Sequence, residues 1–354
     1  MATIREVAAL AGVSTTTVSR VLNAKGSQIP ISDRTKKKVI AAAIELGYEP
    51  NYMAKGLVGC KTETIGLVMY DLAHVLHPNF SQIVHGIVSA LSQSSFDLML
   101  LPLKGKLKRR NPIPFSVASY YRQHRVDGMI IAAQEVSTKA LLELHREECP
   151  FVLLGAHLPG TKLPSVRANV EQGISDLIEH LFSLGHRRIG FINGPEGFRI
   201  NDEMALGYRK ALCRKGLFDT ALLRSSDFTS ETTRKRTKEL LQLHEPPTAI
   251  MAADDLMAIE IMNVITEAGL TVPGDVSVAG YADLSVSGNV TPLLTTVGIP
   301  ISETGRRAAL LLLEILDKNN VRQPVQVLPT ELIVRESTGP VSRWEGNRVL
   351  ADLS

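Results

Sequence analysis

Short apolar runs alternate with amphipathic stretches along most of this chain, from Thr64 to about residue 340. The apolar runs have the length and composition of buried strands, whereas the stretches between them have helical periodicity. The expected strands are Ile65–Met69, Leu98–Leu103, Gly128–Ala132, Phe151–Leu154, Ile189–Ile192, Ala249–Ala253 and Val276–Gly280. The expected helices are Ser81–Gln93, Gln172–Leu184, Met204–Lys215, Thr232–Leu243, Ala258–Ala268 and Glu303–Asp317. This alternation is typical of βαβ units and therefore predicts parallel sheets.

The pattern covers more residues than one sheet comfortably holds, so we expect two α/β subdomains. A ligand-binding cleft between them, at the carboxyl ends of the strands, follows from the same architecture. No uncharged apolar stretch is long enough to span a membrane, and the first residues lack the apolar core of a signal peptide. Cys60, Cys149 and Cys213 have no paired spacing. We therefore expect a cytoplasmic protein without disulfides, metal or membrane partner.

The first 50 residues have a different pattern, that of three short helices. Thr3 followed by Glu6 forms a capping box for a helix over Ile4–Ala11, with Val7, Leu10 and Ala11 as its apolar positions. Gly12 ends that helix, and Ser14 can cap a second one that extends to Leu22. Its inward face is Val18, Val21 and Leu22, and its outward face is Thr15, Thr16, Ser19 and Arg20. A third helix, about Ser32 to Leu46, carries Val39, Ala42, Ala43 and Leu46 inward and Arg34, Lys36, Lys37 and Lys38 outward.

Two short helices joined by a glycine-containing turn are typical of a helix-turn-helix. The charge supports this interpretation, because residues 1–62 carry a net charge of +5 within a chain whose net charge is +3. A basic segment on a slightly acidic body indicates a polyanionic partner. The alternatives are chance clustering of charge and a solvated three-helix bundle with no binding role.

The segments ATIREVAALAGVSTTTVSRVLN, ELGYEPNYMAKGL and KTETIGLV closely resemble the LacI/GalR family of bacterial transcription regulators, and residues 2–23 resemble its purine-repressor branch. The resemblance covers residues 2–338 and implies that Thr15, Thr16 and Arg20 meet bases in the major groove, with Ser19 on the same DNA-binding face. It also implies a hinge helix over Asn51 to Val58, with Asn51 and Lys55 at the DNA and Leu57 wedged into the minor groove. Lys55 stands where arginine is commoner, and about three extra residues lie within Gly26 to Ile31.

The same resemblance implies an all-α helix-turn-helix head and a periplasmic-binding-protein-like core. The implied domains are a DNA-binding head (1–50), a hinge (51–62), a two-lobed core (63–340) and a tail (341–354). Within the core, the first subdomain would be about 63–160 with 292–322, and the second about 161–291 with 323–340. The chain would cross between them near Leu158–Pro164, Asn289–Pro292 and Val321–Pro324.

The expected effector site lacks three charged groups that family members binding sugars or nucleobases use, because Gly155, Met204 and Ala282 stand at those positions. Side chains that remain at the site are Asn79, Phe80, Phe198, Phe228, Asp254 and Tyr281, with Asn169 and Arg199 nearby. An aromatic platform with few charges fits a less polar or planar ligand. The alternative is a vestigial site whose aromatic residues belong to the core.

These observations lead to the hypothesis of a repressor that binds a near-palindromic operator on double-stranded DNA as a homodimer, with a tetramer as a further option. A small-molecule effector, sugar-like by resemblance, would modulate it; no cofactor is expected. The alternative is a core controlled by a partner protein or without ligand control. The basic run 104–110 is interpreted as a solvated loop, and the pair Asp254-Asp255 as structural, so no enzyme is expected.

Overall fold

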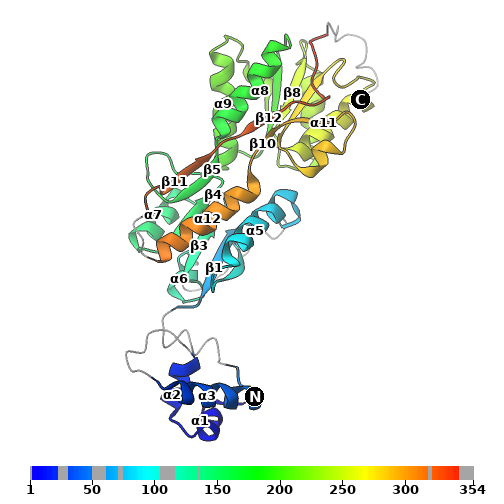
Figure 1. Cartoon of the computed structure of the whole chain (residues 1–354). Helices are drawn as coiled ribbons and strands as arrows, with labels where there is room; N and C mark the ends of the chain where they lie inside the picture. Colours follow the sequence, from blue (N-terminus) through cyan, green and yellow to red (C-terminus); the bar gives the residue numbers. More distant parts are fainter. Residues whose placement is uncertain are drawn as a thin grey trace. The chain divides into compact units, whose positions relative to one another are not determined.

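The computed structural model describes residues 2–22, 31–49, 61–70, 75–103, 116–133, 136–317 and 321–342. These residues divide into two compact units (Figure 1). The first consists of residues 1–64 and 119–127, and the second of residues 65–118 and 128–354. Within the first unit, Asp127 binds the residues that precede the first strand: it accepts hydrogen bonds from the Thr62 and Glu63 backbone N–H groups, at 2.7 and 2.8 Å.

Three helices form the head, and their bounds follow the capping residues. They are α1 (Ile4–Ala11), α2 (Thr15–Leu22) and α3 (Asp33–Glu45). The capping box is present, with the Thr3 N–H donating to Glu6 Oε2 at 2.7 Å and the Glu6 N–H donating to Thr3 Oγ1 at 3.4 Å. The Thr3 N–H and the Thr3 hydroxyl both donate to Glu6 Oε2, and these hydrogen bonds hold the pKa of the Glu6 carboxyl below its ordinary value. The buried residues of the head are Val7, Ala8, Ala11, Val18, Val39, Ala42 and Ala43.

Two apolar residues expected inside the head are exposed instead. Leu10 is 48% exposed, because the buried stripe of α1 runs through Val7, Ala8 and Ala11, and Leu10 lies about a third of a turn from its centre. Leu46 is 36% exposed because the helix ends at Glu45 and Gly47 turns the chain into the left-handed region. Tyr48 then packs against the head core where Leu46 was expected.

The second unit contains two six-stranded sheets, which confirms the α/β prediction. The first sheet has the spatial order β11 (Val325–Leu328), β5 (Ser165–Ala168), β4 (Phe151–Leu154), β3 (Gly128–Ile131), β1 (Thr64–Met69) and β2 (Asp97–Pro102). The second has the order β12 (Glu331–Ile333), β10 (Thr295–Gly298), β9 (Ser277–Ala282), β8 (Ala249–Ala252), β6 (Ile189–Asn193) and β7 (Leu223–Ser225). Among the pairs with a described register, β10 with β12 is antiparallel and the others are parallel.

Helices cover both sheets, and each sheet with its helices is called a lobe here. The first lobe includes α5 (Pro78–Leu91), α7 (Thr138–Arg146) and α12 (Ile301–Leu316). The second lobe includes α8 (Val170–Ser183), α9 (Arg199–Cys213), α10 (Ser230–Leu241) and α11 (Asp255–Glu267). The remaining short helices are α6 (Ser119–Arg122), η2 (Thr220–Leu222) and η3 (Ser285–Gly288). Within the described part of the chain, no helix combines the length and apolar character that crossing a membrane requires.

The chain passes between the lobes three times, and each passage lies later than the resemblance implied. The passages follow β5, β10 and β11, whereas the expected ones, Leu158–Pro164, Asn289–Pro292 and Val321–Pro324, precede these strands. Each of the three strands is four residues long and mixes polar with apolar side chains, so none formed an apolar run in the sequence. Two passages are tied together, because the Asn169 N–H donates to the Leu328 carbonyl at 2.8 Å.

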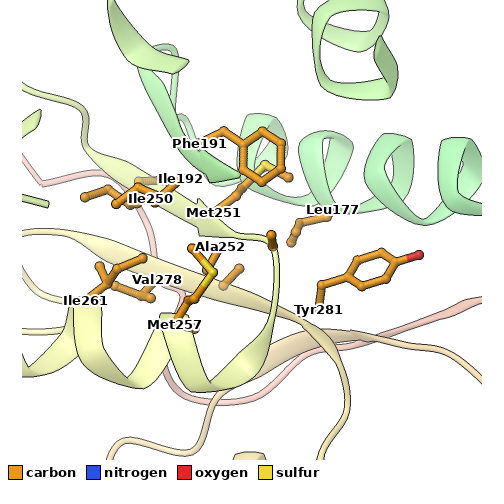
Figure 2. Packing of buried hydrophobic residues seen from close by; sticks show 14 of the residues in the cluster. Leu177, Phe191, Ile192, Ile250, Met251, Ala252, Met257, Ile261, Val278 and Tyr281 are labelled. Carbon is orange, nitrogen blue, oxygen red and sulfur yellow. The ribbon is translucent and has the colours of Figure 1, made fainter. Parts of the chain in front are cut away.

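Each lobe has its own apolar core. The core of the first lobe joins β1, β3 and β4 to α5 and α12 through residues such as Ile65, Ile130 and Leu312. The core of the second lobe surrounds Ile250 and Val278 and extends to Tyr281, whose hydroxyl points away from the other labelled side chains (Figure 2). Because the strands are parallel, the loops at their carboxyl ends gather along one edge of each sheet.

Candidate nucleic-acid interface and effector site

The outward face of α2 carries the polar residues that the sequence predicts. Thr15, Thr16 and Arg20 are exposed and Ser19 is half-buried. Val18, on the opposite side, is fully buried in the head core. Hydroxyl and guanidinium groups on an exposed helix face can donate hydrogen bonds to phosphates and to base edges in a major groove.

The beginning of α2 is capped by a side chain, as expected. The Ser14 Oγ accepts a hydrogen bond from the Thr17 N–H at 3.1 Å and lies 2.9 Å from the Thr17 hydroxyl. The other N–H groups of the first turn have no helical partner, and with the helix dipole they favour a negatively charged group. A phosphate is therefore a suitable ligand for this end of the helix.

The third helix adds positive charge to the head. Arg34, Lys37 and Lys38 are exposed, and the Lys36 Nζ lies 3.2 Å from Asp33 Oδ1. The remaining DNA-binding predictions, Asn51, Lys55 and Leu57, lie outside the described residues, as do the basic run 104–110 and residues 343–354. For the described part of the head, the geometry offers one polar helix face and a cationic helix beside it.

The second candidate site lies where the two lobes meet, and we call it the lobe junction. Of the predicted effector residues, Asn79 and Asp254 come from opposite lobes and are linked through His77. The His77 Nδ1 accepts from the Asn79 N–H at 3.3 Å, and its Nε2 lies 3.6 Å from Asp254 Oδ2. Asp254 also caps α11, because its Oδ1 accepts from the Met257 N–H at 2.7 Å. The Asn79 Oδ1 is buried and has no hydrogen-bond partner.

Tyr281 lies at the lobe junction beside a charged cluster. It is 4% exposed, its hydroxyl has no hydrogen-bond partner, and burial together with the Glu203 carboxylate raises its pKa. Glu203 belongs to the second lobe, yet its carboxylate contacts two residues of the first lobe. His157 Nδ1 lies 3.0 Å from Glu203 Oε1, and Arg167 Nη1 lies 3.5 Å from Glu203 Oε2. The Arg167 Nε is buried without a partner.

The predicted aromatic residues do not form one platform. Phe80 is buried in the core of the first lobe, which agrees with the alternative interpretation of a core residue. Phe198 is half-buried at the start of α9. Phe228 is 44% exposed and its ring lies over Gly194, where a Cβ atom would also collide with Asn201. Asn201 donates to the Pro195 carbonyl at 2.9 Å and so fixes this loop.

The three positions without the expected charges have different surroundings. Gly155 has a positive φ of 77° at the end of β4, and Met204 is buried in the core of the second lobe. Ala282 has a φ of 116°, a backbone conformation that costs free energy for a residue with a side chain. None of these side chains can offer a hydrogen bond to a ligand.

Asp255 lies beneath the lobe junction and has a structural role, as expected. Its carboxylate accepts hydrogen bonds from the Leu284 N–H at 2.6 Å and from the Thr296 hydroxyl at 2.5 Å. The side chain is fully buried, and burial raises the pKa of the carboxyl above its ordinary value. It joins α11 to the segment that follows β9 and to β10 itself.

Sequence reasoning did not identify His77, His157, Arg167 and Glu203 as site residues. Glu203 immediately precedes Met204, but its negative charge does not replace the arginine that the resemblance implies at position 204. Arg167 lies in β5, a strand that the hydropathy pattern did not predict. The described residues contain no group of three His, Cys, Asp or Glu side chains that could hold a metal ion.

Comparisons with known sequences agree with both units. Residues 3–51 match the model for bacterial regulatory proteins of the lacI family, and residues 178–338 match that for a periplasmic binding protein-like domain. The transcriptional repressor CytR of Escherichia coli is 32% identical over 338 residues, covering 95% of this chain and 96% of CytR. The transcriptional repressor PurR of Photobacterium profundum is 30% identical over 340 residues, covering 95% of this chain and 98% of PurR.

A solved structure extends the likeness to the whole fold. The crystal structure of the Lac repressor dimer, bound to operator and to the anti-inducer ONPF, superposes with a TM-score of 0.82 at 30% sequence identity. The match covers 96% of this chain and 99% of the other.

Proposed function

Because the chain belongs to the lacI family of bacterial regulatory proteins, we propose that it is a repressor that binds operator DNA through its head. The outward face of α2 is the observation that carries this proposal. Thr15, Thr16 and Arg20 are exposed on a helix whose other side is fixed in the head core. Arg20 is suited to a bidentate contact with guanine, and the two threonines to bases or phosphates. We assign Ser19, which is half-buried, to the same face.

The operator is near-palindromic in this proposal, and the repressor binds it as a homodimer. One eight-residue recognition helix reaches only a few base pairs, and a twofold pair doubles the sequence that is read. The Lac repressor dimer bound to operator, a relative of the same fold, supports this arrangement. Asn51, Lys55 and Leu57 would contribute the hinge contacts, within a division into head (1–50), hinge (51–62) and core (63–340).

The core is proposed to receive a small effector at the lobe junction. Asn79, Asp254 and Tyr281 would supply its polar contacts, because the Asn79 Oδ1 and the Tyr281 hydroxyl are buried without partners. A buried polar atom without a hydrogen bond is costly, which favours a ligand that supplies one. Phe198 and Phe228 would line the approach. The identity of relatives as repressors supports a protein that regulates rather than catalyses, and binding to DNA fits a cytoplasmic location.

Selection of DNA fragments by the purified full-length protein tests the DNA-binding proposal. A library of genomic fragments from the source bacterium should yield one enriched, near-palindromic motif. Binding to that motif should weaken steeply with salt, because the head displaces counterions from phosphates. Recovery of fragments without a shared motif, bound equally by the protein and by a version lacking residues 1–62, would overturn the proposal.

A further inference from the structure

Four contacts that the protein's own side chains make join the lobes across the lobe junction. Glu203 reaches His157 and Arg167, His77 reaches Asp254, and Arg199 donates to the Val136 carbonyl. In each case one partner belongs to the first lobe and the other to the second. A binding site between two lobes normally depends on its ligand to bridge them, whereas here side chains already do so.

Glu203 makes the most extensive of these contacts. Its carboxylate places one oxygen 3.0 Å from His157 Nδ1 and the other 3.5 Å from Arg167 Nη1, so both oxygens point to the first lobe. The side chain is 20% exposed, which limits the screening of these contacts by water. Its position in the second turn of α9 is rigid, because α9 packs against α8 and buries Met204 and Tyr208.

The same cluster contains two buried polar atoms without hydrogen bonds, the Arg167 Nε and the Tyr281 hydroxyl. Arg167 is therefore only partly satisfied by Glu203, and the contact at 3.5 Å is longer than a strong charge-assisted hydrogen bond. A group that offered better hydrogen bonds to Arg167 and Tyr281 would compete directly with Glu203. The contact between Glu203 and Arg167 therefore bridges the lobes, but it leaves part of the hydrogen-bonding capacity of Arg167 unused, so a ligand can replace it.

We propose that Glu203 is an interlobe latch: it holds the lobes together in the absence of a ligand by binding Arg167 and His157. A ligand that enters the lobe junction acts by displacing Glu203 from these two residues. In this scheme the lobes of the unliganded core keep the arrangement described here, and ligand binding frees them to change that arrangement. The regulatory consequence rests on the proposed function, but the latch itself is a property of the core.

Distance measurements between spin labels test the latch in the full chain. Cysteines replace Lys139 on α7 and Glu231 on α10, both of which are exposed. Cys60 and Cys213 are replaced by serine, and the buried Cys149 is kept. Dilution with unlabelled chain ensures that each measured pair lies within one chain. Neither ligand nor DNA is present, so failure of the DNA-binding proposal does not affect the result.

Glu203→Ala should shift the distance distribution or add a second population, relative to the otherwise unchanged labelled chain. Glu239→Ala is the matched control, because Glu239 contacts Arg236 and Arg224 within the second lobe and should leave the distribution unchanged. Arg167→Met removes the partner in the first lobe and should reproduce the effect of Glu203→Ala. If Glu203→Ala does not fold, the distance distribution of Arg167→Met tests the latch by itself. Distributions that superimpose on that of the parent for the folded variants would overturn the latch.

Discussion

The outward face of α2 and the lobe junction both gather polar side chains, but they use them in opposite ways. On α2, Thr15, Thr16 and Arg20 are directed to solvent and the backbone is stabilised elsewhere, by Ser14 and by the buried Val18. At the lobe junction, Glu203 and Asp254 already contact residues of the other lobe. The first surface is available to a partner as it stands, whereas a partner of the second must replace contacts that exist.

This difference has a consequence for affinity. A ligand of the exposed face exchanges the hydrogen bonds that these side chains make with water for its own, and it breaks no contact within the protein. A ligand of the lobe junction gains only the difference between its own contacts and those it displaces. Strong operator binding and weak, selective effector binding are expected from the same protein.

The largest expected effect concerns the packing that positions the junction residues of α5. Gly86→Ala should destabilise the first lobe by about 3 kcal/mol, because the added Cβ would collide with the backbone of Ser302 in α12. Urea unfolding monitored by circular dichroism measures this loss. Gly288→Ala is the control, because a Cβ at Gly288 would meet nothing within 4 Å. Equal stability of the two variants would show that α5 and α12 are loosely packed.

Arg20→Ala tests the exposed face directly. It should weaken binding to the selected operator by roughly 10- to 100-fold, about 1–3 kcal/mol, with no change in the melting temperature of the core. Fluorescence anisotropy with labelled operator measures the affinity. Arg146→Ala removes an exposed arginine of α7 and should bind like the wild type. If the two variants bind equally well, Arg20 does not contact DNA.

Two threonines of the head separate stability from binding. Thr3→Ala removes the capping box and should cost about 1 kcal/mol of helix stability. Hydrogen exchange of the intact protein, followed in the segment 2–22, should show this loss as faster exchange. Thr16→Ala should leave that exchange rate nearly unchanged and alter operator selectivity instead. Faster exchange in Thr16→Ala, with selectivity retained, would indicate that Thr16 is structural.

The smallest expected effect is a change in pH dependence at Asp255, beneath the lobe junction. Its folded-state pKa is raised, so the unfolded chain releases this proton at a lower pH than the folded chain does. The free energy of unfolding should therefore fall as the pH rises from the ordinary carboxyl range, near 3.8, through the raised folded value. Asp255→Asn should lack this component, and urea unfolding at several pH values measures it. Identical pH profiles for the two proteins would mean that the pKa of Asp255 is the same in the folded and the unfolded chain.

The head was predictable because its signals are local. The capping residues Thr3 and Ser14 and the polar face of α2 all lie within one or two helical turns, so spacing alone specifies them. Leu10 and Leu46 were misplaced because which side of a short helix is buried depends on its neighbours. The apolar strands of the core were also predicted, since every residue of β1, β4 and β8 is buried.

The lobe junction could not be predicted in the same way. Its contacts join residues far apart in the chain, such as Arg167 with Glu203 and His77 with Asp254. Asn79, Asp254 and Tyr281 were proposed from the resemblance, but their actual partners depend on how the two sheets meet. The strand β5, which positions Arg167, mixes polar with apolar residues and is therefore not visible in the hydropathy pattern.

The three passages between the lobes also affect the biogenesis of the protein. The first lobe receives α12 and its edge strand β11 only from residues 301–328, after almost all of the second lobe has been synthesised. A ribosome-bound chain that stops near residue 290 therefore lacks one helix and one strand of the first lobe. The two lobes are completed within a few residues of each other, and this late, long-range closure favours slow and cooperative folding of the core. A C-terminal truncation that extends past residue 328 into β11 should thus damage both lobes rather than leave one of them intact.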